Sequence, residues 1–236
     1  CHGLDEMPII ISMSLGAGSK NFSNRDIREI IVEAEDKMYR HKLLESRSTR
    51  SSFIISLEKT LWTRSHETKD HCRRMQKIAQ RIGRAINLPD SELDNLKLLA
   101  ALHDIGKIAI PNSILDKAGS LTQEEWEAIK KHPEIGYRIA ISSPELAPIA
   151  EAILNHHERW DGRGYPLGVK GDRIPLISRI IAIADTYDVM VNGRPYQKTV
   201  SSEEALNEIV RCAGTQFDPD LVNKTMEMFV PTKQLN

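Results

Sequence analysis

Residues 103–107 read His-Asp-Ile-Gly-Lys, and residues 156–166 read His-His-Glu-Arg-Trp-Asp-Gly-Arg-Gly-Tyr-Pro. A histidine next to an aspartate supplies a neutral nitrogen ligand and a carboxylate that can bridge two cations. His103 and Asp104 alone are a weak signal, because such pairs also arise by chance. Further histidines and carboxylates on predicted helices accompany them, so we expect a helical protein that binds metal.

Four more histidines and a glutamate surround this pair in the sequence. Glu67 and His71 stand four residues apart in what the pattern predicts to be helix, which would place both side chains on one helical face. His132 interrupts an apolar helical pattern, and His156 and His157 are adjacent at a predicted helix end. Each has an ordinary alternative when taken singly, such as a surface Glu–His pair or a partly buried histidine.

Asp185 lies in the strongly apolar segment 176–191. A carboxylate there needs a partner, because burying a bare charge is costly. A metal ion is one such partner and an arginine is another. The complete set of candidate metal ligands is Glu67, His71, His103, Asp104, His132, His156, His157 and Asp185.

Helix bundles commonly build metal sites from side chains on facing helices. Mixed nitrogen and oxygen ligands without thiolates suit iron or manganese, and zinc is an alternative. Eight ligand side chains exceed what one ion needs. The sequence therefore predicts two or three divalent metal ions.

Hydrophobic periodicity predicts a mostly α fold. Residues 8–16 have the pattern of a strand and residues 23–45 that of an amphipathic helix, and strand signals almost vanish after Ser52. We expect a small strand-helix remnant of an α/β domain, followed by an all-α bundle of about six or seven helices. The expected helices of the bundle cover 53–88 as one helix or two, 90–105, 122–141, 145–157, 176–191, one after Ser201 and one from about Asp218. Capping-box patterns, with a glutamate three residues after Thr122 and after Ser201, predict the starts of two of them.

Composition excludes several classes of protein. The 236 residues carry 32 Lys and Arg against 33 Asp and Glu, for a net charge of −1, which argues against coating a nucleic-acid polymer. No run of about 18 apolar residues and no signal peptide occur, so we expect no membrane segment and a cytoplasmic location. Three scattered cysteines do not form a disulfide framework. The start at Cys1 suggests a piece of a longer protein.

The quoted motifs resemble the HD-GYP subgroup of the HD-domain metal-dependent phosphohydrolases. The resemblance runs from about Leu57 to Phe229, and the long motif at 156–166 is highly specific. The segments 185–190, 194–196 and 214–219 match as well. Such proteins are bacterial signalling phosphodiesterases, so the resemblance implies that a metal-activated water hydrolyses cyclic di-GMP to pGpG or GMP.

The resemblance also assigns roles to the candidate ligands. It makes four residues the core metal ligands: His71, His103, Asp104 and Asp185. It makes three others complete a second metal position, with Asp104 bridging: His132, His156 and His157. Glu67 matches a position that supports a third metal in some members.

Substrate contacts follow from the same resemblance. It places Lys107 near the scissile phosphate, as a cation or as an acid for the leaving oxygen, and makes Lys107 and Asp104 the catalytic pair. The residues it implies for substrate binding are Arg163, Gly164, Tyr165, Pro166, Arg194 and Lys198. Members often have a basic residue directly after the Arg-Pro-Tyr motif, and here Gln197 stands there. Either Tyr165 or Trp160 could stack on a base, and Trp160 could equally anchor its loop.

The first residues resemble a different family. Segments 11–16 and 34–42 look like the last strand and helix of a GGDEF diguanylate cyclase domain, without its catalytic residues. We therefore expect residues 1–46 to be a GGDEF-like remnant, residues 47–56 a linker or helical junction, and residues 57–236 the phosphohydrolase domain. A homodimer or a GGDEF-type protein partner is compatible with this arrangement.

Two other functions remain open at this stage. The chain could be a signalling module that binds a cyclic dinucleotide with little turnover, or an HD phosphohydrolase that acts on another nucleotide. The complete ligand set argues against the binding module, because a module without turnover would be expected to have lost metal ligands.

Overall fold

The structure is a computed structural model that describes residues 17, 26–64, 68–193 and 199–229. These residues are mostly helical, and the described part contains no β-strand, only an isolated bridge between Ala213 and Phe217. The chain divides into two compact units, residues 1–55 and 56–236. The expectation of a mostly α fold is confirmed.

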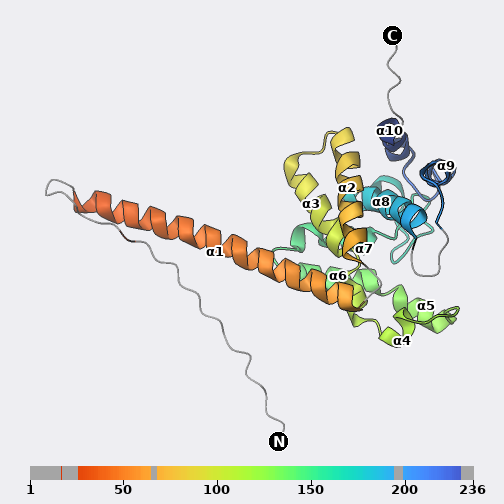
Figure 1. The fold of residues 1–236 in the computed structure, drawn as a ribbon, viewed down its shortest axis with the longest axis horizontal. Helices are drawn as coiled ribbons and strands as arrows, with labels where there is room; N and C mark the ends of the chain where they lie inside the picture. Colours follow the sequence, from red (N-terminus) through yellow and green to blue (C-terminus); the bar gives the residue numbers. More distant parts are fainter. Residues whose placement is uncertain (1–16, 18–25, 65–67, 194–198, 230–236) are drawn as a thin grey trace, which may run out of the picture. The chain divides into compact units, whose positions relative to one another are not determined.

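Helix α1 spans Ile27–Arg64 and the remaining elements belong to the second unit (Figure 1). The other α-helices are α2 Lys69–Ala85, α3 Asp90–Leu102, α4 Asn112–Leu115, α5 Gln123–Ile129, α6 His132–Ile141, α7 Ala150–Asn155, α8 Leu176–Asn192, α9 Ser202–Arg211 and α10 Pro219–Phe229. Three 3₁₀ helices complete the described part: η1 Ile105–Ala109, η2 Ala147–Ile149 and η3 Gly171–Arg173. The expected number of six or seven helices was too low, because the helix predicted over 122–141 is two helices and the short helix α4 was not predicted.

The first break separates α1 from α2. Of the two alternatives for segment 53–88, the structure has two helices, and α2 begins after Thr68, whose hydroxyl accepts a hydrogen bond from the backbone N–H of His71 at 3.1 Å. The backbone of Thr68 is extended, as is usual for an N-cap residue. Glu67 lies outside the described residues, so the expectation that Glu67 and His71 share one helical face stays a prediction.

The second break divides the segment that we expected to be one helix from 122 to 141. The capping box of Thr122 and Glu125 is present and starts α5, but α5 ends at Ile129 and α6 begins at His132. Pro133 lies in the first turn of α6, where its missing N–H costs no hydrogen bond. A second capping box, Ser201 with Glu204, starts α9 as predicted.

Helix α8 is the central element of the second unit. It packs against α2, α3, α7, α9 and α10 (Figure 1). Ile180, Ile183 and Ala184 of α8 are fully buried, as are Leu96 and Leu99 of α3. The apolar composition of 176–191 thus predicted its central position correctly, and this burial gives α8 a fixed place from which Asp185 projects.

The first unit contains the amino-terminal part of α1. There the Lys37 ammonium donates to the backbone carbonyl of Ala17 at 3.2 Å. The strand predicted over 8–16 lies outside the described residues. The backbone is helical throughout 47–56, the segment predicted as a linker or helical junction. The assignment of residues 1–46 to a GGDEF-like domain stays a prediction. Among the described helices, none combines the length and apolar character that crossing a bilayer requires.

Candidate metal centre

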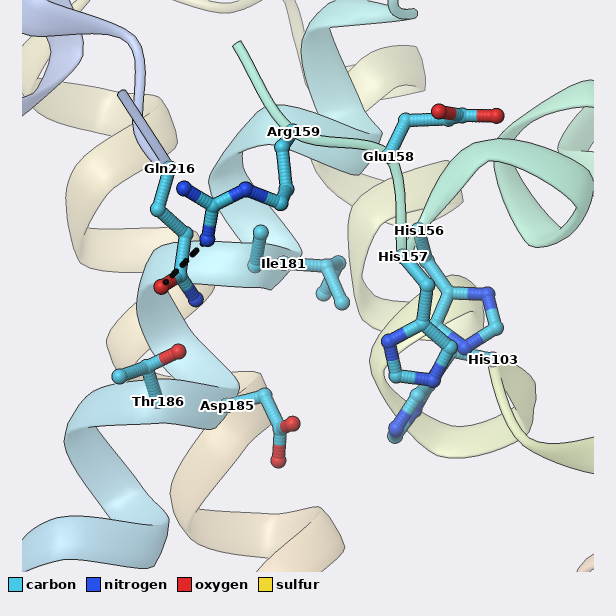
Figure 2. A pocket seen from close by; sticks show the side chains of 10 residues that line it. His103, His156, His157, Glu158, Arg159, Ile181, Asp185, Thr186 and Gln216 are labelled. Atoms are coloured by element: carbon cyan, nitrogen blue, oxygen red, sulfur yellow. Dashed lines mark hydrogen bonds between the residues drawn. The ribbon is translucent and has the colours of Figure 1, made fainter. Parts of the chain in front are cut away.

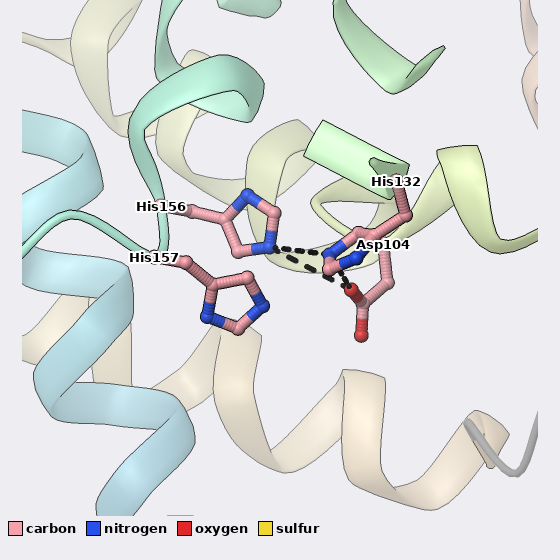
Figure 3. Close-up of side chains that lie close together, drawn as sticks. All are labelled: Asp104, His132, His156 and His157. Carbon is pink, nitrogen blue, oxygen red and sulfur yellow. Dashed lines mark hydrogen bonds and ion pairs between the residues drawn. The ribbon is translucent and has the colours of Figure 1, made fainter. Parts of the chain in front are cut away.

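Four side chains converge where η1, α6 and α7 meet. Asp104, His132, His156 and His157 each offer one ligand atom, and these atoms lie within 4.8 Å of one another (Figure 3). Asp104 precedes η1, His132 opens α6, and His156 caps the carboxyl end of α7. Residues separated by up to 53 positions in the sequence thus form one cluster, which we call the first cluster.

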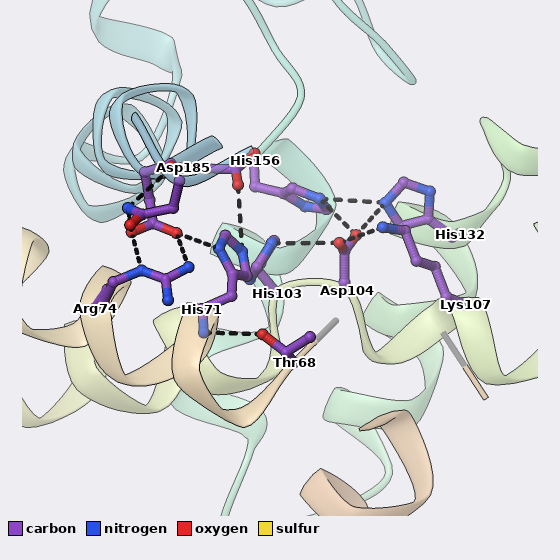
Figure 4. A network of polar contacts seen from close by, with 11 residues as sticks. Thr68, His71, Arg74, His103, Asp104, Lys107, His132, His156 and Asp185 are labelled. Carbon is purple, nitrogen blue, oxygen red and sulfur yellow. Dashed lines mark hydrogen bonds and ion pairs between the residues drawn. The ribbon is translucent and has the colours of Figure 1, made fainter. Parts of the chain in front are cut away.

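A second cluster adjoins it. His71 of α2, His103 at the end of α3 and Asp185 of α8 also place ligand atoms within 4.8 Å of one another. His71 Nε2 lies 3.4 Å from Asp185 Oδ1. The two clusters are linked by His103, whose Nε2 lies 3.4 Å from Asp104 Oδ2 (Figure 4).

Hydrogen bonds at the far side of the rings fix the imidazole tautomers in the first cluster. Nδ1 of His132 lies 2.7 Å from the carbonyl oxygen of Ile129, and Nδ1 of His156 lies 2.6 Å from that of Ile153. A carbonyl only accepts, so Nδ1 carries the proton in both rings. Nε2 of each ring therefore faces the cluster, and in a neutral imidazole this atom carries the lone pair that binds a metal ion.

These lone pairs point at one another and at a carboxylate. The Nε2 atoms of His132 and His156 are 3.2 Å apart, and Asp104 Oδ1 lies 2.9 Å from the first and 3.6 Å from the second. Electron pairs so close together repel, and a cation held among them removes the repulsion. Imidazole nitrogens that donate from their other side to carbonyls are the usual ligands of metal ions, so the residues present fit a metal.

His71 of the second cluster is oriented by a carboxylate. Its Nδ1 donates to Asp188 Oδ2 at 2.7 Å, and the Arg74 guanidinium donates to both oxygens of Asp188 at 2.7 and 2.9 Å. Burial would raise the pKa of Asp188, but the hydrogen bonds from His71 and Arg74 outweigh burial and lower it. An ionised Asp188 holds His71 with Nε2 toward Asp185, the arrangement that supports metal-ligating histidines.

Burial sets the charge of the first cluster. Loss of hydration lowers the pKa of His156 to about 4 and that of His157 well below its ordinary value, with the neighbouring imidazoles adding to the effect for both. Burial alone would raise the pKa of Asp104, but the Lys107 ammonium holds that pKa well below its usual range. Neutral imidazoles beside an ionised carboxylate are the protonation states that bind a cation.

Close packing of η1 on α6 brings Asp104 to His132. A Cβ atom on Gly106 would lie 1.9 Å from the carbonyl oxygen of His132 and 2.7 Å from the backbone nitrogen of Gly136. Only glycine permits this approach. This close packing explains why a glycine stands in the segment His-Asp-Ile-Gly-Lys. Lys107 follows it, and its ammonium donates to Asp104 Oδ2 at 2.5 Å.

The loop after α7 folds against the first cluster. A Cβ on Gly164 would meet the backbone of Glu158 and Arg159 at 2.5 Å, so this position needs glycine. Tyr165 stacks on His157, with ring centroids 4.8 Å apart. Of the other residues predicted to contact substrate from this loop, Arg163 is exposed and Pro166 is half-buried.

Trp160 has the surroundings of an anchor for this loop. Its backbone N–H donates to the Gln216 carbonyl at 3.1 Å, and the Arg179 guanidinium lies 5.6 Å from its ring centroid. Tyr165 already uses one ring face on His157. Base stacking by either residue is untested and stays a prediction.

A cavity of about 230 Å³ opens beside both clusters (Figure 2). His103, His156, His157 and Asp185 line one part of it. The opposite wall is made by side chains that the sequence did not single out: Arg159, Thr186 and Gln216. The candidate metal centre therefore faces a polar chamber that a ligand can enter.

Seven of the eight predicted metal ligands meet in these two clusters, and Glu67 lies outside the described residues, as do Arg194 and Lys198. Sequence reasoning missed Asp188 and Arg74, although each stands three residues after a predicted ligand on the same helix. It also missed Arg159 and Gln216, which lie inside quoted motifs.

The fold and site define a helical protein that gathers histidines and aspartates from five helices and turns into a candidate metal centre. The profile of the HD-domain family matches residues 54–221. The chain belongs to the HD-domain family.

Its relatives include named phosphodiesterases. A cyclic di-GMP phosphodiesterase of Thermotoga maritima is 42% identical over 167 residues, covering 70% of this chain and 45% of that protein. A 3′3′-cGAMP-specific phosphodiesterase 2 of Vibrio cholerae is 37% identical over 187 residues, covering 78% of this chain and 36% of that protein. The chain thus spans less than half the length of these relatives.

A solved structure has the same fold. A cyclic GMP-AMP-specific phosphodiesterase of Vibrio cholerae superposes with a TM-score of 0.57 at 28% identity, over 75% of this chain and 48% of that chain. The similarity supports the helical arrangement that carries the two clusters.

Proposed function

We propose that this chain is a metal-dependent phosphodiesterase of the HD-GYP type that hydrolyses cyclic di-GMP to pGpG, GMP or both. One observation carries the proposal. Two adjoining histidine–aspartate clusters, with lone pairs turned inward, open onto a polar cavity within an HD-domain fold. The names of the relatives supply the substrate class.

Seven side chains would hold the metal ions, with Asp104 facing both clusters: His71, His103, Asp104, His132, His156, His157 and Asp185. Bound divalent ions would activate water at neutral pH and neutralise charge on the phosphate oxygens. Nitrogen and oxygen ligands without thiolates favour iron or manganese, and zinc is the alternative. A third ion would require Glu67, which we propose as its ligand.

Lys107 supports the reaction from the same face. Its ammonium lies against Asp104 Oδ2, where it balances the carboxylate and can donate to an oxygen of the substrate phosphate. Hydrolysis forms a bond between the water oxygen and phosphorus and breaks the bond from phosphorus to the 3′ oxygen. Lys107 or a water hydrogen-bonded to it would give the 3′ oxygen its proton.

Other substrate contacts rest on the motif resemblance. We propose that Arg194 and Lys198 bind the phosphates or a guanine edge, as guanidinium and ammonium groups do. Gly164 and Pro166 would shape the loop, and Arg163 and Tyr165 would approach the ligand from it. For residues 1–46 we propose a GGDEF-like origin, without cyclase activity.

The decisive experiment pairs metal analysis with product analysis. Protein prepared without oxygen should contain two or three divalent ions per chain and convert cyclic di-GMP to linear product. H103A and D104A should lose metal and hydrolysis together while helical circular dichroism remains. Full activity of a metal-free variant would contradict the mechanism, and binding without product would identify a binding module instead.

A second substrate is favoured by a specific similarity. The relative named as 3′3′-cGAMP-specific is 37% identical and aligns with 78% of this chain. Parallel assays with cyclic di-GMP and 3′3′-cGAMP, compared by kcat/KM, would decide which one the site prefers.

A further inference from the structure

The cavity beside the clusters has a second polar wall that the proposed hydrolysis does not use. Arg159 and Gln216 form this wall, opposite His103, His156 and His157, with Ile181 between them (Figure 2). We infer that Arg159 and Gln216 bind the edge of a guanine base of the substrate and so decide which phosphodiester bond is cut. This inference rests on the proposed function and deepens it.

Hydrogen bonds hold the wall in place. Arg159 Nε and Nη2 donate to the two oxygens of Asp161 at 3.1 and 2.9 Å, and Arg159 Nη1 donates to Gln216 Oε1 at 3.3 Å. The backbone N–H groups of Trp160 and Asp161 donate to the carbonyls of Gln216 and Thr215 at 3.1 and 2.8 Å. The arginine and the glutamine therefore stay adjacent, because both backbone and side-chain contacts join their loops.

The wall offers donors. Arg159 has five N–H groups and these contacts use three, while the Gln216 carbonyl is occupied, so its amide contributes N–H groups. Guanine presents two acceptors, N7 and O6, at one edge, whereas adenine presents an acceptor and an N–H donor there. A pair of donors therefore suits guanine and opposes adenine.

Charge and size favour a base over a phosphate at this wall. The salt bridge to Asp161 compensates the charge of Arg159, so a neutral acceptor gains most from the remaining donors. The cavity of about 230 Å³ is smaller than the roughly 300–1,000 Å³ of sites that enclose a whole small ligand. It admits one part of a cyclic dinucleotide while the phosphate stays at the clusters.

A fixed guanine has a consequence for mixed dinucleotides. In 3′3′-cGAMP only one base is guanine, so holding it at Arg159 places one of the two phosphates at the clusters. The wild-type protein should then release one linear product in excess over the other. It should also discriminate against cyclic di-AMP by about 10- to 100-fold in kcat/KM, as expected when a paired donor edge is mismatched.

The test compares two substrates in metal-loaded protein. Bis(p-nitrophenyl) phosphate carries no purine and reports on the metal centre alone. R159A and Q216E should lower kcat/KM for cyclic di-GMP by about 10-fold or more, leave hydrolysis of bis(p-nitrophenyl) phosphate near wild type, and remove the product bias with 3′3′-cGAMP. R211A is the matched control, because Arg211 makes a similar paired contact with Glu208 on an exposed helix face.

Each alternative has its own result. Equal losses of kcat/KM for cyclic di-GMP and for bis(p-nitrophenyl) phosphate in R159A and Q216E would show that the wall only supports the fold. In that case D161N, which keeps the guanidinium but loses its salt bridge, should show the same losses as R159A. Unchanged activity on cyclic di-GMP and an unchanged product ratio would also overturn the inference, with the proposed function intact. A wild-type protein that cleaves bis(p-nitrophenyl) phosphate but no cyclic dinucleotide would overturn both.

Discussion

Asp104 has two carboxylate oxygens that face different partners. Oδ1 lies 2.9 Å from His132 Nε2, and Oδ2 lies near His103 Nε2 and the Lys107 ammonium. The side chain is almost fully buried, so its charge is stabilised only by these neighbours. At the scale of single residues, this carboxylate joins the two clusters into one centre.

A substitution of Asp188 tests whether its carboxylate orients His71 for metal binding in the second cluster. D188N should weaken metal binding about 10- to 100-fold, because His71 loses the carboxylate that orients its ring and fixes its tautomer. Metal titration of the chelator-treated protein measures this loss. D172N is the control, since Asp172 also pairs with an arginine but its side chain is 91% exposed. Equal affinities in D188N and wild type would show that Asp188 does not position His71.

The buried histidines predict how the metal-free protein responds to pH. The pKa of His156 is about 4 in the folded state and lies near 6.5 when unfolded, so the unfolded chain binds more protons in that range. Stability should therefore fall as pH drops from about 6.5 toward 4, by up to about 1.4 kcal/mol per pH unit for each such histidine.

Chemical denaturation with a chelator at several pH values checks this slope. H156N removes one titrating group, so its slope should be shallower than that of wild type. A stability that stays constant between pH 6.5 and 4.5 would contradict the burial of neutral imidazoles. Added metal should oppose the loss, because bound cations exclude protons from the same nitrogens.

At the scale of elements, the site depends on how closely η1 approaches α6. G106A should force these elements apart, because the new Cβ would lie 1.9 Å from the His132 carbonyl oxygen. We expect a loss of about 1–3 kcal/mol or more in unfolding free energy, together with reduced metal content. G119A is the control, since no atom lies within 4 Å of a Cβ there, and it should stay within about 0.5 kcal/mol of wild type.

Local signals in the sequence predicted the start of a helix well where the residues that fix the start are close together in the sequence. Thr122 and Ser201 each start a helix through a capping box, and both helices were predicted from that pattern. The division of 53–88 into two helices was one of two alternatives, and the break before His132 was not predicted, because its polar residues also fit a continuous helix. Only packing against other elements decides where such a helix stops.

The sequence predicted those site residues that can be recognised by their side-chain chemistry. Histidines and aspartates spread over several predicted helices, together with the family resemblance, identified the seven side chains that the structure gathers. Asp188 was missed because its contact with His71 joins positions 117 apart, which only the fold brings together. Arg159 and Gln216, 57 positions apart, were missed for the same reason.

At the scale of the whole molecule, both clusters and the cavity belong to the second unit, residues 56–236. A chain of residues 56–236 should therefore keep its metal content and its hydrolysis of cyclic di-GMP. It retains Leu61 at the end of α1, which is 1% exposed and belongs to the core.

Substitution of Leu61 shows the size of effect expected when a core residue of the second unit is lost, for comparison with removal of residues 1–55. In the shortened chain, L61A should cost about 2–5 kcal/mol of unfolding free energy, as truncating a buried leucine does. Removal of residues 1–55 alone should leave the denaturation midpoint of the second unit nearly unchanged, because its buried side chains remain. Loss of metal on removing residues 1–55, with Leu61 intact, would show instead that the first unit contributes to the site.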